Sequence, residues 1–150
     1  MKSKRTADVH IKYHRAGFES AAGHNVRSTM EAAVCDWLMK NSIAHRHMSE
    51  VFTVRIGPAK TPTVYAPDIL LHDKDKKGRT IIIEPFDAYT PRVGSTRIIA
   101  SFRKDMGENY YVIVVAKKGQ MTKVFKEAYD LLVDFDKLDG LKKRLPQPLD

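Results

Sequence analysis

Two acidic residues in apolar surroundings could form a metal-dependent catalytic site in this chain. Asp68 lies in the middle of an apolar stretch, and Glu84 comes directly after three isoleucines. An ionised carboxylate in such a place is costly unless it is paired or binds a metal. If the two segments are adjacent strands, the carboxylates lie side by side and repel each other. A Mg²⁺ ion relieves that repulsion, because it prefers oxygen ligands, and it can also stabilise charge on a phosphoryl group.

Glu31 is the third candidate for this site, and two interpretations of it stay open. It lies in line with Val34 and Leu38, at the edge of the apolar stripe of a predicted helix, so it leans towards the sheet. The segment Ser28-Thr29-Met30-Glu31 also matches the capping-box pattern, in which the glutamate satisfies the start of the helix. Glu31 could serve either role or both.

Alternating helices and strands are expected to position these residues. Apolar residues at helical spacing predict helices over 26–40, 95–106 and 121–135. Apolar runs bounded by turn residues predict strands over 45–56, 64–72, 79–84 and 110–116. The order α-β-β-β-α-β-α predicts an α/β fold with a central mixed sheet of at least four strands. We expect 64–71 to pair antiparallel with 79–84, and the pairing to stop at Pro85, which has no backbone N–H.

The composition indicates a globular, strongly basic chain. Its 150 residues fit one domain, and its formal net charge is +8. Such a charge favours polyanionic partners, with nucleic acid ahead of an acidic membrane, because a membrane partner would need an amphipathic or lipidated anchor. The longest apolar run is far too short to span a bilayer. A single cysteine forms no internal disulfide, which suits a reducing cytosol, so we expect a cytoplasmic protein without a membrane partner.

Charge and composition divide the chain into three parts. We expect a mobile basic arm over 1–24, the α/β domain over 25–136 and a polar tail over 137–150. A basic arm beside a nucleic-acid site can track phosphates. The residues expected to contact nucleic acid are basic residues of the arm, of the turn at 57–62 and of the helix at 95–106: Lys12, Arg15, Arg55, Lys60, Arg97, Arg103 and Lys104.

The order of elements and the spacing of the acidic residues resemble the PD-(D/E)XK superfamily of nucleases. Pro67-Asp68 is followed by Glu84 after fifteen residues, and the chain is similar in size and in the helix glutamate, Glu31, to archaeal Holliday-junction resolvases. The resemblance covers roughly residues 26–118. It implies a restriction-endonuclease-like core, Mg²⁺ (or Mn²⁺ in its place) held by Asp68 and Glu84, and hydrolysis of phosphodiester bonds in DNA, including structured or branched DNA. RNA stays open as a substrate.

One position departs from the superfamily pattern. Phe86 stands two residues after Glu84, where the superfamily carries a lysine. A lysine there would orient or activate water and offset developing charge, and phenylalanine can do neither. Lys104 is the first candidate to replace that charge, followed by Arg103 and Arg97.

Three functions therefore remain open. A Mg²⁺-dependent endonuclease is expected first, as a homodimer, because cutting two strands is easiest with two related sites. A catalytically weak or inactive nucleic-acid-binding module on the same fold is the second, and it is favoured by Phe86. A structural domain in which Asp68 and Glu84 pair with basic side chains is the third.

The remaining chemically active residues have simpler interpretations. Cys35, inside the predicted first helix, is expected to be a buried core thiol, because nothing marks a base beside it. His45 and His47 fall on one face of a predicted strand and could meet phosphate or solvent. His10 and His14 have no cysteine pair or third histidine nearby in sequence, so we interpret them as surface histidines.

Overall fold

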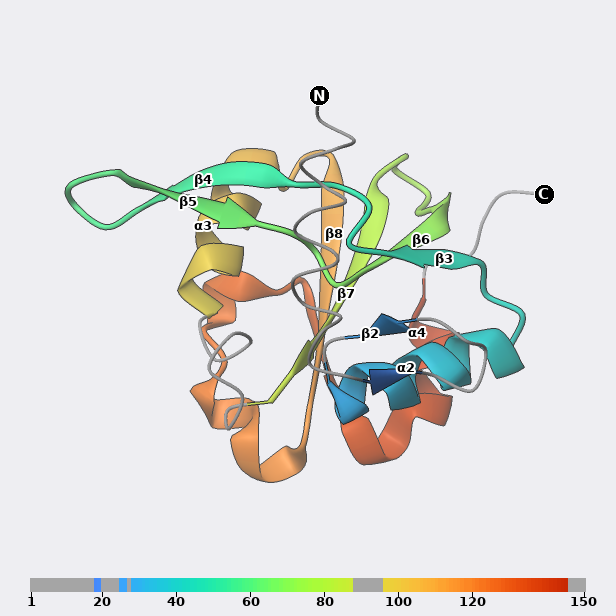
Figure 1. The fold of residues 1–150 in the computed structure, drawn as a ribbon. Helices are drawn as coiled ribbons and strands as arrows, with labels where there is room; N and C mark the ends of the chain where they lie inside the picture. Colours follow the sequence, from blue (N-terminus) through green and yellow to red (C-terminus); the bar gives the residue numbers. More distant parts are fainter. Residues whose placement is uncertain (1–17, 20–24, 27, 88–95, 146–150) are drawn as a thin grey trace.

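A five-stranded mixed sheet forms the centre of the fold (Figure 1). The computed structural model describes residues 18–19, 25–26, 28–87 and 96–145. The strands in sheet order are β3 (His45–His47), β6 (Ile69–Lys74), β7 (Thr80–Phe86), β8 (Tyr110–Ala116) and β9 (Leu131–Asp134). The β3–β6 and β6–β7 pairs are antiparallel, whereas β7–β8 and β8–β9 are parallel. The predicted α/β class and mixed sheet are confirmed, while the restriction-endonuclease-like topology stays a prediction.

Helices and short 3₁₀ segments cover the two faces of this sheet (Figure 1). Helix α2 (Thr29–Lys40) packs on one face, where its inward residues meet alternate residues of β6, β7 and β8. Helix α3 (Thr96–Met106) packs on the other face through Ile99 and Phe102. Successive side chains of a strand point to opposite faces, so β7, covered on both sides, is apolar throughout its centre. The predicted helix at 95–106 and strand at 110–116 are therefore confirmed in their described parts.

Strand β7 continues through Pro85 to Phe86, which corrects the predicted stop at Pro85. The antiparallel ladder with β6 ends at Ile69 opposite Ile83, whereas the parallel ladder with β8 runs on to Phe86 opposite Ala116. Beyond Ile83, β7 therefore has a described strand neighbour on one side only. A proline is tolerated there as it is on an edge strand, because no second ladder needs its N–H.

Two predicted strands are each divided between two sheets. β4 (Phe52–Ile56) and β5 (Thr61–Tyr65) form a separate antiparallel hairpin that extends away from the main sheet and packs on α3 (Figure 1). The segment 45–56 breaks at Met48, which adopts a φ of 46°. The segment 64–72 breaks between Tyr65 and Ile69, around Pro67, and this break leaves Asp68 in the connection just before β6.

The predicted helix at 121–135 is wrong. The chain instead forms the 3₁₀ segments η1 (Lys118–Lys123) and η2 (Lys126–Ala128), and then strand β9. β9 adds to the sheet beside β8, with Leu131 opposite Ile113. Pairing with the open side of β8 outweighs the helical propensity of this segment, and Val124, Ala128 and Val133 are buried in this arrangement.

The structure also differs from the polar tail predicted over 137–150. Segment η3 (Phe135–Gly140) leads into α4 (Leu141–Arg144). Leu141 is fully buried in the core beneath α2, and Leu145 is 9% exposed in the same core. The Trp37 indole N–H donates a hydrogen bond to Asp139 at 2.9 Å and so joins α2 to this segment. Leu141 and Leu145 thus anchor this segment to the core, while most of its other described side chains are exposed, and 146–150 lie outside the described residues.

The first described elements come before α2. β1 (Phe18–Glu19) pairs with β2 (Asn25–Val26), so the helix predicted from 26 begins at Thr29. Ser28 caps it by accepting a hydrogen bond from the Glu31 backbone N–H at 3.0 Å. The rest of the arm predicted over 1–24 lies outside the described residues, together with Lys12 and Arg15.

The turn between β6 and β7 is held by Asp75. Its Oδ1 accepts the backbone N–H groups of Lys77 and Arg79, and its Oδ2 accepts the Arg79 Nε–H at 2.7 Å. Burial alone would raise the pKa of Asp75, but the hydrogen bonds from Arg79 and Lys77 and the charge of Arg79 lower it. This turn fixes the antiparallel register that brings the start of β6 beside the end of β7.

Candidate metal-dependent active site

The structure places Asp68 and Glu84 next to each other, at the start of β6 and near the end of β7. The Asp68 backbone N–H donates a hydrogen bond to Glu84 Oε2 at 3.3 Å. Both residues are buried, with exposed fractions of 1% and 6%. The last rung between the two strands, Ile69 opposite Ile83, lies directly beside them. This proximity is what adjacent strand ends led us to expect, and joint binding of a metal stays a prediction.

Tyr65 fixes the orientation of Glu84. Its hydroxyl donates a hydrogen bond to Glu84 Oε2, and its ring packs on Phe102 of α3 with centroids 4.8 Å apart. Tyr65 is the last residue of β5 and is 6% exposed. The base of the hairpin therefore helps to position the candidate metal ligand, a role that sequence analysis did not assign to this tyrosine.

The carboxylate of Glu31 contacts a histidine on the side of the sheet that α2 covers. Glu31 is 1% exposed, and its Oε2 lies 2.9 Å from His47 Nδ1. His47 lies opposite Ile69 in the β3–β6 ladder, and Ile69 directly follows Asp68 in the sequence. One hydrogen bond of the predicted capping box is present, from the Glu31 backbone N–H to the Ser28 hydroxyl. The Glu31 carboxylate itself points towards His47 of β3. Participation of Glu31 in the Asp68–Glu84 site stays a prediction.

Phe86, at the position of the superfamily lysine, is packed into the core on the α3 face. It is 3% exposed and follows Glu84 by two residues, so both side chains point to the same face of β7. A cavity of about 100 Å³ borders it, lined by Met30, Phe86, Asp87, Lys117 and Gln120. Lys117 directly follows Ala116, the partner of Phe86 in the β7–β8 ladder. Lys117, which sequence analysis did not consider, lines the same cavity as Phe86, while its ammonium lies 5.9 Å from the centroid of the Phe135 ring.

Lys104 lies on a different part of the surface. It lines an open hollow of about 750 Å³ together with Gly57 at the hairpin turn and Arg79 at the start of β7. Arg79 directly precedes β7 and lies five residues before Glu84, which corresponds to about 16 Å of extended chain. Lys104 thus borders this hollow, and its predicted role as the replacement for the missing lysine stays a prediction.

The other basic candidates differ in the contacts that their side chains make within the protein. Arg103 forms an ion pair with Asp130 at 2.6 Å, and this hydrogen bond and charge raise the pKa of Arg103 although burial opposes the shift. Arg97 lies over the Phe125 ring, 5.3 Å from its centroid, and remains exposed. Arg55 and Lys60 are exposed on the hairpin. Arg103 therefore has a structural role, and the exposed basic residues remain the better candidates for phosphate contact.

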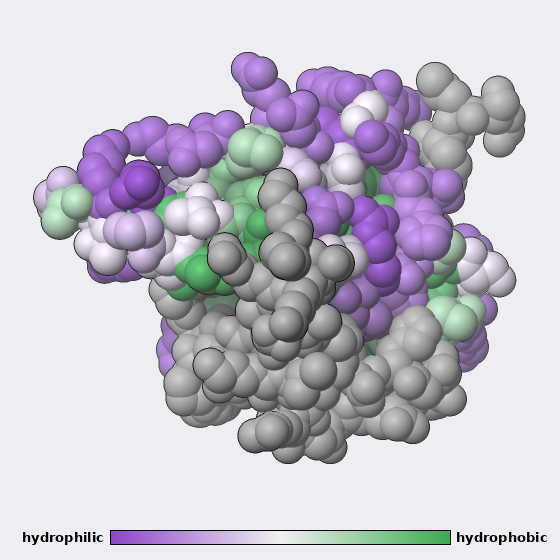
Figure 2. Space-filling model, turned by 45° about the horizontal axis from the view of Figure 1, so that its top comes forward, coloured by the Kyte–Doolittle hydropathy of each residue, from purple (hydrophilic) through white to green (hydrophobic). Residues whose placement is uncertain are grey.

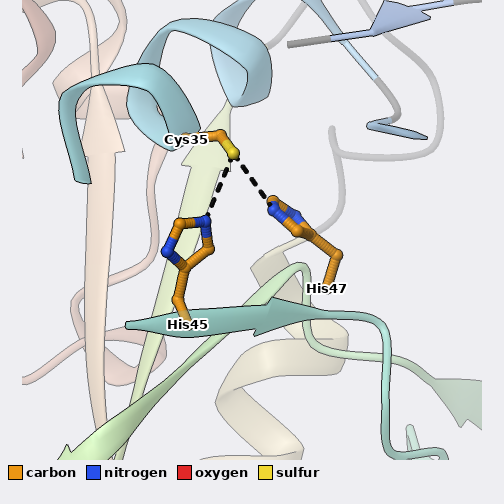
Figure 3. Close-up of side chains that lie close together, drawn as sticks. All are labelled: Cys35, His45 and His47. Atoms are coloured by element: carbon orange, nitrogen blue, oxygen red, sulfur yellow. Dashed lines mark hydrogen bonds between the residues drawn. The ribbon is translucent and has the colours of Figure 1, made fainter. Parts of the chain in front are cut away.

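Sequence analysis missed a cluster of three side chains between α2 and β3 (Figure 3). Cys35 Sγ lies 3.2 Å from His45 Nε2 and 3.3 Å from His47 Nε2. Cys35 is buried, as expected of a core thiol, but both histidines point at it rather than at phosphate or solvent. The alternation His45-x-His47 was the available signal, because it places both rings on the face of β3 that α2 covers.

Comparisons with known proteins add no relative to these observations. No family model, no curated protein and no solved structure matches the chain. Among the helices that the structure describes, none is long and apolar enough to cross a membrane. A function for this chain therefore has to be argued from the chemistry of its own side chains.

Proposed function

We propose that the protein is a Mg²⁺-dependent endonuclease that hydrolyses phosphodiester bonds in DNA, including structured or branched DNA. The observation that carries the proposal is the buried pair Asp68 and Glu84, held together at the ends of adjacent strands. Two carboxylates provide the oxygen donors that Mg²⁺ and Mn²⁺ favour. Burial of two neighbouring acidic residues disfavours their charged forms, and a bound cation would offset that penalty.

Each residue of the site has a distinct task in this proposal. Asp68 and Glu84 would hold the ion, with Glu31 as the candidate third carboxylate. When bound, Mg²⁺ supplies a water of lowered pKa and stabilises charge on the phosphoryl group. Tyr65 and the Asp68 backbone N–H hold Glu84 in a fixed orientation. Lys117, beside the position of Phe86, would offset negative charge on the substrate.

Replacing each of the two lysines, Lys117 and Lys104, by alanine tests which one supplies that charge. We expect Lys117→Ala to lower kcat for DNA cleavage about 10²-fold or more, as loss of an electrostatic stabiliser does. Lys104→Ala should leave kcat nearly unchanged and raise KM, because its hollow lies near the start of β7. Steady-state kinetics on one duplex substrate measures both effects. If Lys104→Ala shows the larger loss of kcat, Lys104 is the catalytic cation after all.

The basic surface around α3 and the hairpin is proposed to hold the DNA backbone. Figure 2 shows that the surface of the projecting hairpin is mostly hydrophilic, and its exposed residues include Arg55 and Lys60. The hollow beside it is lined by Arg97 and Lys104, both exposed. Contacts with phosphates release counterions, so affinity for DNA should fall linearly with salt on a logarithmic scale.

Removing two of these charges should change the salt dependence of binding. For the double variant Arg97→Ala/Lys104→Ala, we expect the slope of log affinity against log salt to decrease in magnitude by about 1.8 for duplex DNA, about 0.9 for each lost phosphate contact. Lys40→Ala is the matched control, because Lys40 is exposed at the end of α2. Fluorescence anisotropy over a range of salt concentrations measures the slopes. A slope equal to that of the control variant would remove the hollow from the DNA interface.

A second function, a nucleic-acid-binding module without catalysis, is favoured by one observation, the packing of Phe86 in the core. The two functions are separated by incubating the wild-type chain with linear, branched and single-stranded DNA and with RNA, in Mg²⁺ or Mn²⁺. Cleavage of any form that depends on the metal supports the nuclease. Salt-dependent binding without cleavage of any form establishes the binding module instead.

A homodimer is part of the nuclease proposal. A single site cuts one strand at a time, so two copies related by a two-fold axis would cut both strands of a duplex. Sedimentation of the free chain and of its DNA complex measures the number of copies.

A further inference from the structure

The cluster of Cys35, His45 and His47 connects α2 to the edge strand of the main sheet. Cys35 lies on the inward face of α2, and the two histidines belong to β3 (Figure 3). The sulfur and the two Nε2 atoms all lie within 4.8 Å of one another. Cys35 is fully buried, His45 is 8% exposed and the His47 side chain is 6% exposed. Three metal-ligating atoms thus converge in a place with little access to solvent.

The outer nitrogen of each histidine fixes its tautomer. His45 Nδ1 lies 2.9 Å from the backbone carbonyl oxygen of Ile43, which only accepts hydrogen bonds, so this nitrogen carries a hydrogen. His47 Nδ1 lies 2.9 Å from Glu31 Oε2, and an ionised carboxylate likewise only accepts. In a neutral ring with hydrogen on Nδ1, the Nε2 atom is a lone-pair donor. Both rings therefore direct a lone pair at the same sulfur.

A thiol has a single hydrogen to offer to these two nitrogens. Cys35 has one S–H, so it can donate to His45 or to His47 but not to both. A divalent cation satisfies all three groups, because a thiolate and two neutral imidazoles are each ligands for it. The contacts of the outer nitrogens, one to a carbonyl and one to a carboxylate, are those that metal-bound histidines generally make.

From this arrangement we infer a second metal site, formed by Cys35 Sγ, His45 Nε2 and His47 Nε2, for a borderline-soft divalent ion of the Zn²⁺ class. Nitrogen and sulfur ligands favour zinc, whereas magnesium favours oxygen, so this ion differs from the one proposed at Asp68 and Glu84. In a tetrahedral zinc site the sulfur and a nitrogen are about 3.6 Å apart, given Zn–S of about 2.3 Å and Zn–N of about 2.0–2.1 Å. The two S···N distances of 3.2 Å and 3.3 Å therefore need to open by only a few tenths of an ångström.

The ion has a structural role in this inference. Its ligands are buried, and they come from helix α2 and from β3, the strand at the edge of the sheet. The ion therefore ties these two elements together. A fourth ligand, such as water, would complete the tetrahedron. Through His47, the ion also orients Glu31, which is a positioning residue for this site whether or not it belongs to the nuclease site.

Cobalt titration of the full-length wild-type chain tests the site directly. After chelation and dialysis, addition of Co²⁺ should produce visible d–d bands of a tetrahedral ion and a near-ultraviolet thiolate-to-cobalt charge-transfer band, saturating at about one equivalent. The chain contains one cysteine, so the charge-transfer band can arise only from Cys35. Zn²⁺ should then displace Co²⁺ and abolish both bands. Neither readout depends on cleavage of DNA, so failure of this site and failure of the nuclease proposal are distinguishable.

Variants assign the other ligands. His47→Gln should weaken Co²⁺ binding by at least about 10²-fold, while Glu31→Gln should weaken it by about 10–100-fold, as loss of a contact behind a metal ligand does. His72→Gln is the matched control, because His72 is an exposed histidine on the neighbouring strand β6. Far-ultraviolet circular dichroism verifies that each variant folds. Cys35→Ser should remove the charge-transfer band, and if that variant fails to fold, the wild-type titration and the His47 variant still decide.

Two outcomes overturn the inference. The first is a wild-type chain that gives no charge-transfer band with Co²⁺ and takes up no zinc when purified from zinc-supplemented medium. In that case the cluster is a buried set of hydrogen-bond contacts that holds no metal. The second is a wild-type spectrum that His47→Gln leaves unchanged, because the histidine would then not be a ligand.

Discussion

Asp68→Asn and Glu84→Gln should each lower the rate of Mg²⁺-dependent DNA cleavage by at least about 10³-fold, because loss of a metal ligand removes several kcal/mol of transition-state stabilisation. Both substitutions keep the size of the side chain and remove its charge. Single-turnover cleavage at saturating enzyme isolates the chemical step from binding.

The two variants should fold as well as the wild type in the absence of metal. Each substitution removes the charge of a buried carboxyl group and keeps a polar end that accepts hydrogen bonds, so the free energy of unfolding should not decrease. Binding of DNA without metal should be equal or tighter, since less negative charge faces phosphate. Asp73→Asn, at an exposed aspartate of β6, is the matched control and should cleave at the wild-type rate. Cleavage by both site variants at near wild-type rates would place the chemistry elsewhere.

Leu141→Ala should reduce the free energy of unfolding by about 2–5 kcal/mol, the range for deleting a large buried aliphatic side chain. Leu141 has no exposed surface, and it packs beneath α2 against the same core as Leu38 and Ile113. Lys143→Ala, two residues away and exposed, should change stability by no more than about 0.5 kcal/mol. Urea denaturation followed by circular dichroism measures both. Equal stability of the two variants would mean that the last described segment does not stabilise the fold.

The central strands and the acidic pair could be predicted from sequence because their signals are local. Continuous apolar runs in β7 and β8 indicated strands covered on both faces, and both strands are present. A carboxylate in an apolar run is unusual by itself, so Asp68 and Glu84 were recognisable without knowledge of the fold. The antiparallel β6–β7 pair followed from a short charged turn, which Asp75 indeed holds.

The remaining features depend on contacts between distant parts of the chain. The apolar pattern over 121–135 is compatible with a helix. The segment forms 3₁₀ turns and β9 because β8 offers an unpaired side to which a strand can add, and this pairing cannot be seen in the local sequence. The polarity of residues 137–145 hid Leu141, because one leucine carries no periodicity. Lys117 lines a cavity with Phe86 because the β7–β8 ladder places Ala116 opposite Phe86, whereas Lys104 was named as a basic residue of the following helix.

The Cys35 cluster likewise depends on a contact between separate elements that the sequence does not reveal. Nine residues separate Cys35 from His45, and no metal-binding motif with that spacing was recognised. The rings meet the sulfur only because α2 packs over the edge strand β3 (Figure 3). Glu31 has a similar history, since its place in the sequence suggested a cap or a metal ligand, and the fold adds a contact with His47.

Anomalous scattering from crystals of the wild-type chain soaked in Mn²⁺ tests the central claim most directly. The proposal predicts a manganese peak within coordinating distance of carboxylate oxygens of both Asp68 and Glu84, and loss of that peak in crystals of Glu84→Gln. Because manganese favours oxygen ligands, any manganese peak at the Cys35 cluster should be weaker than the peak at Asp68 and Glu84. Well-ordered crystals in millimolar Mn²⁺ with no peak at Asp68 and Glu84 would contradict the proposal that this pair holds a catalytic metal.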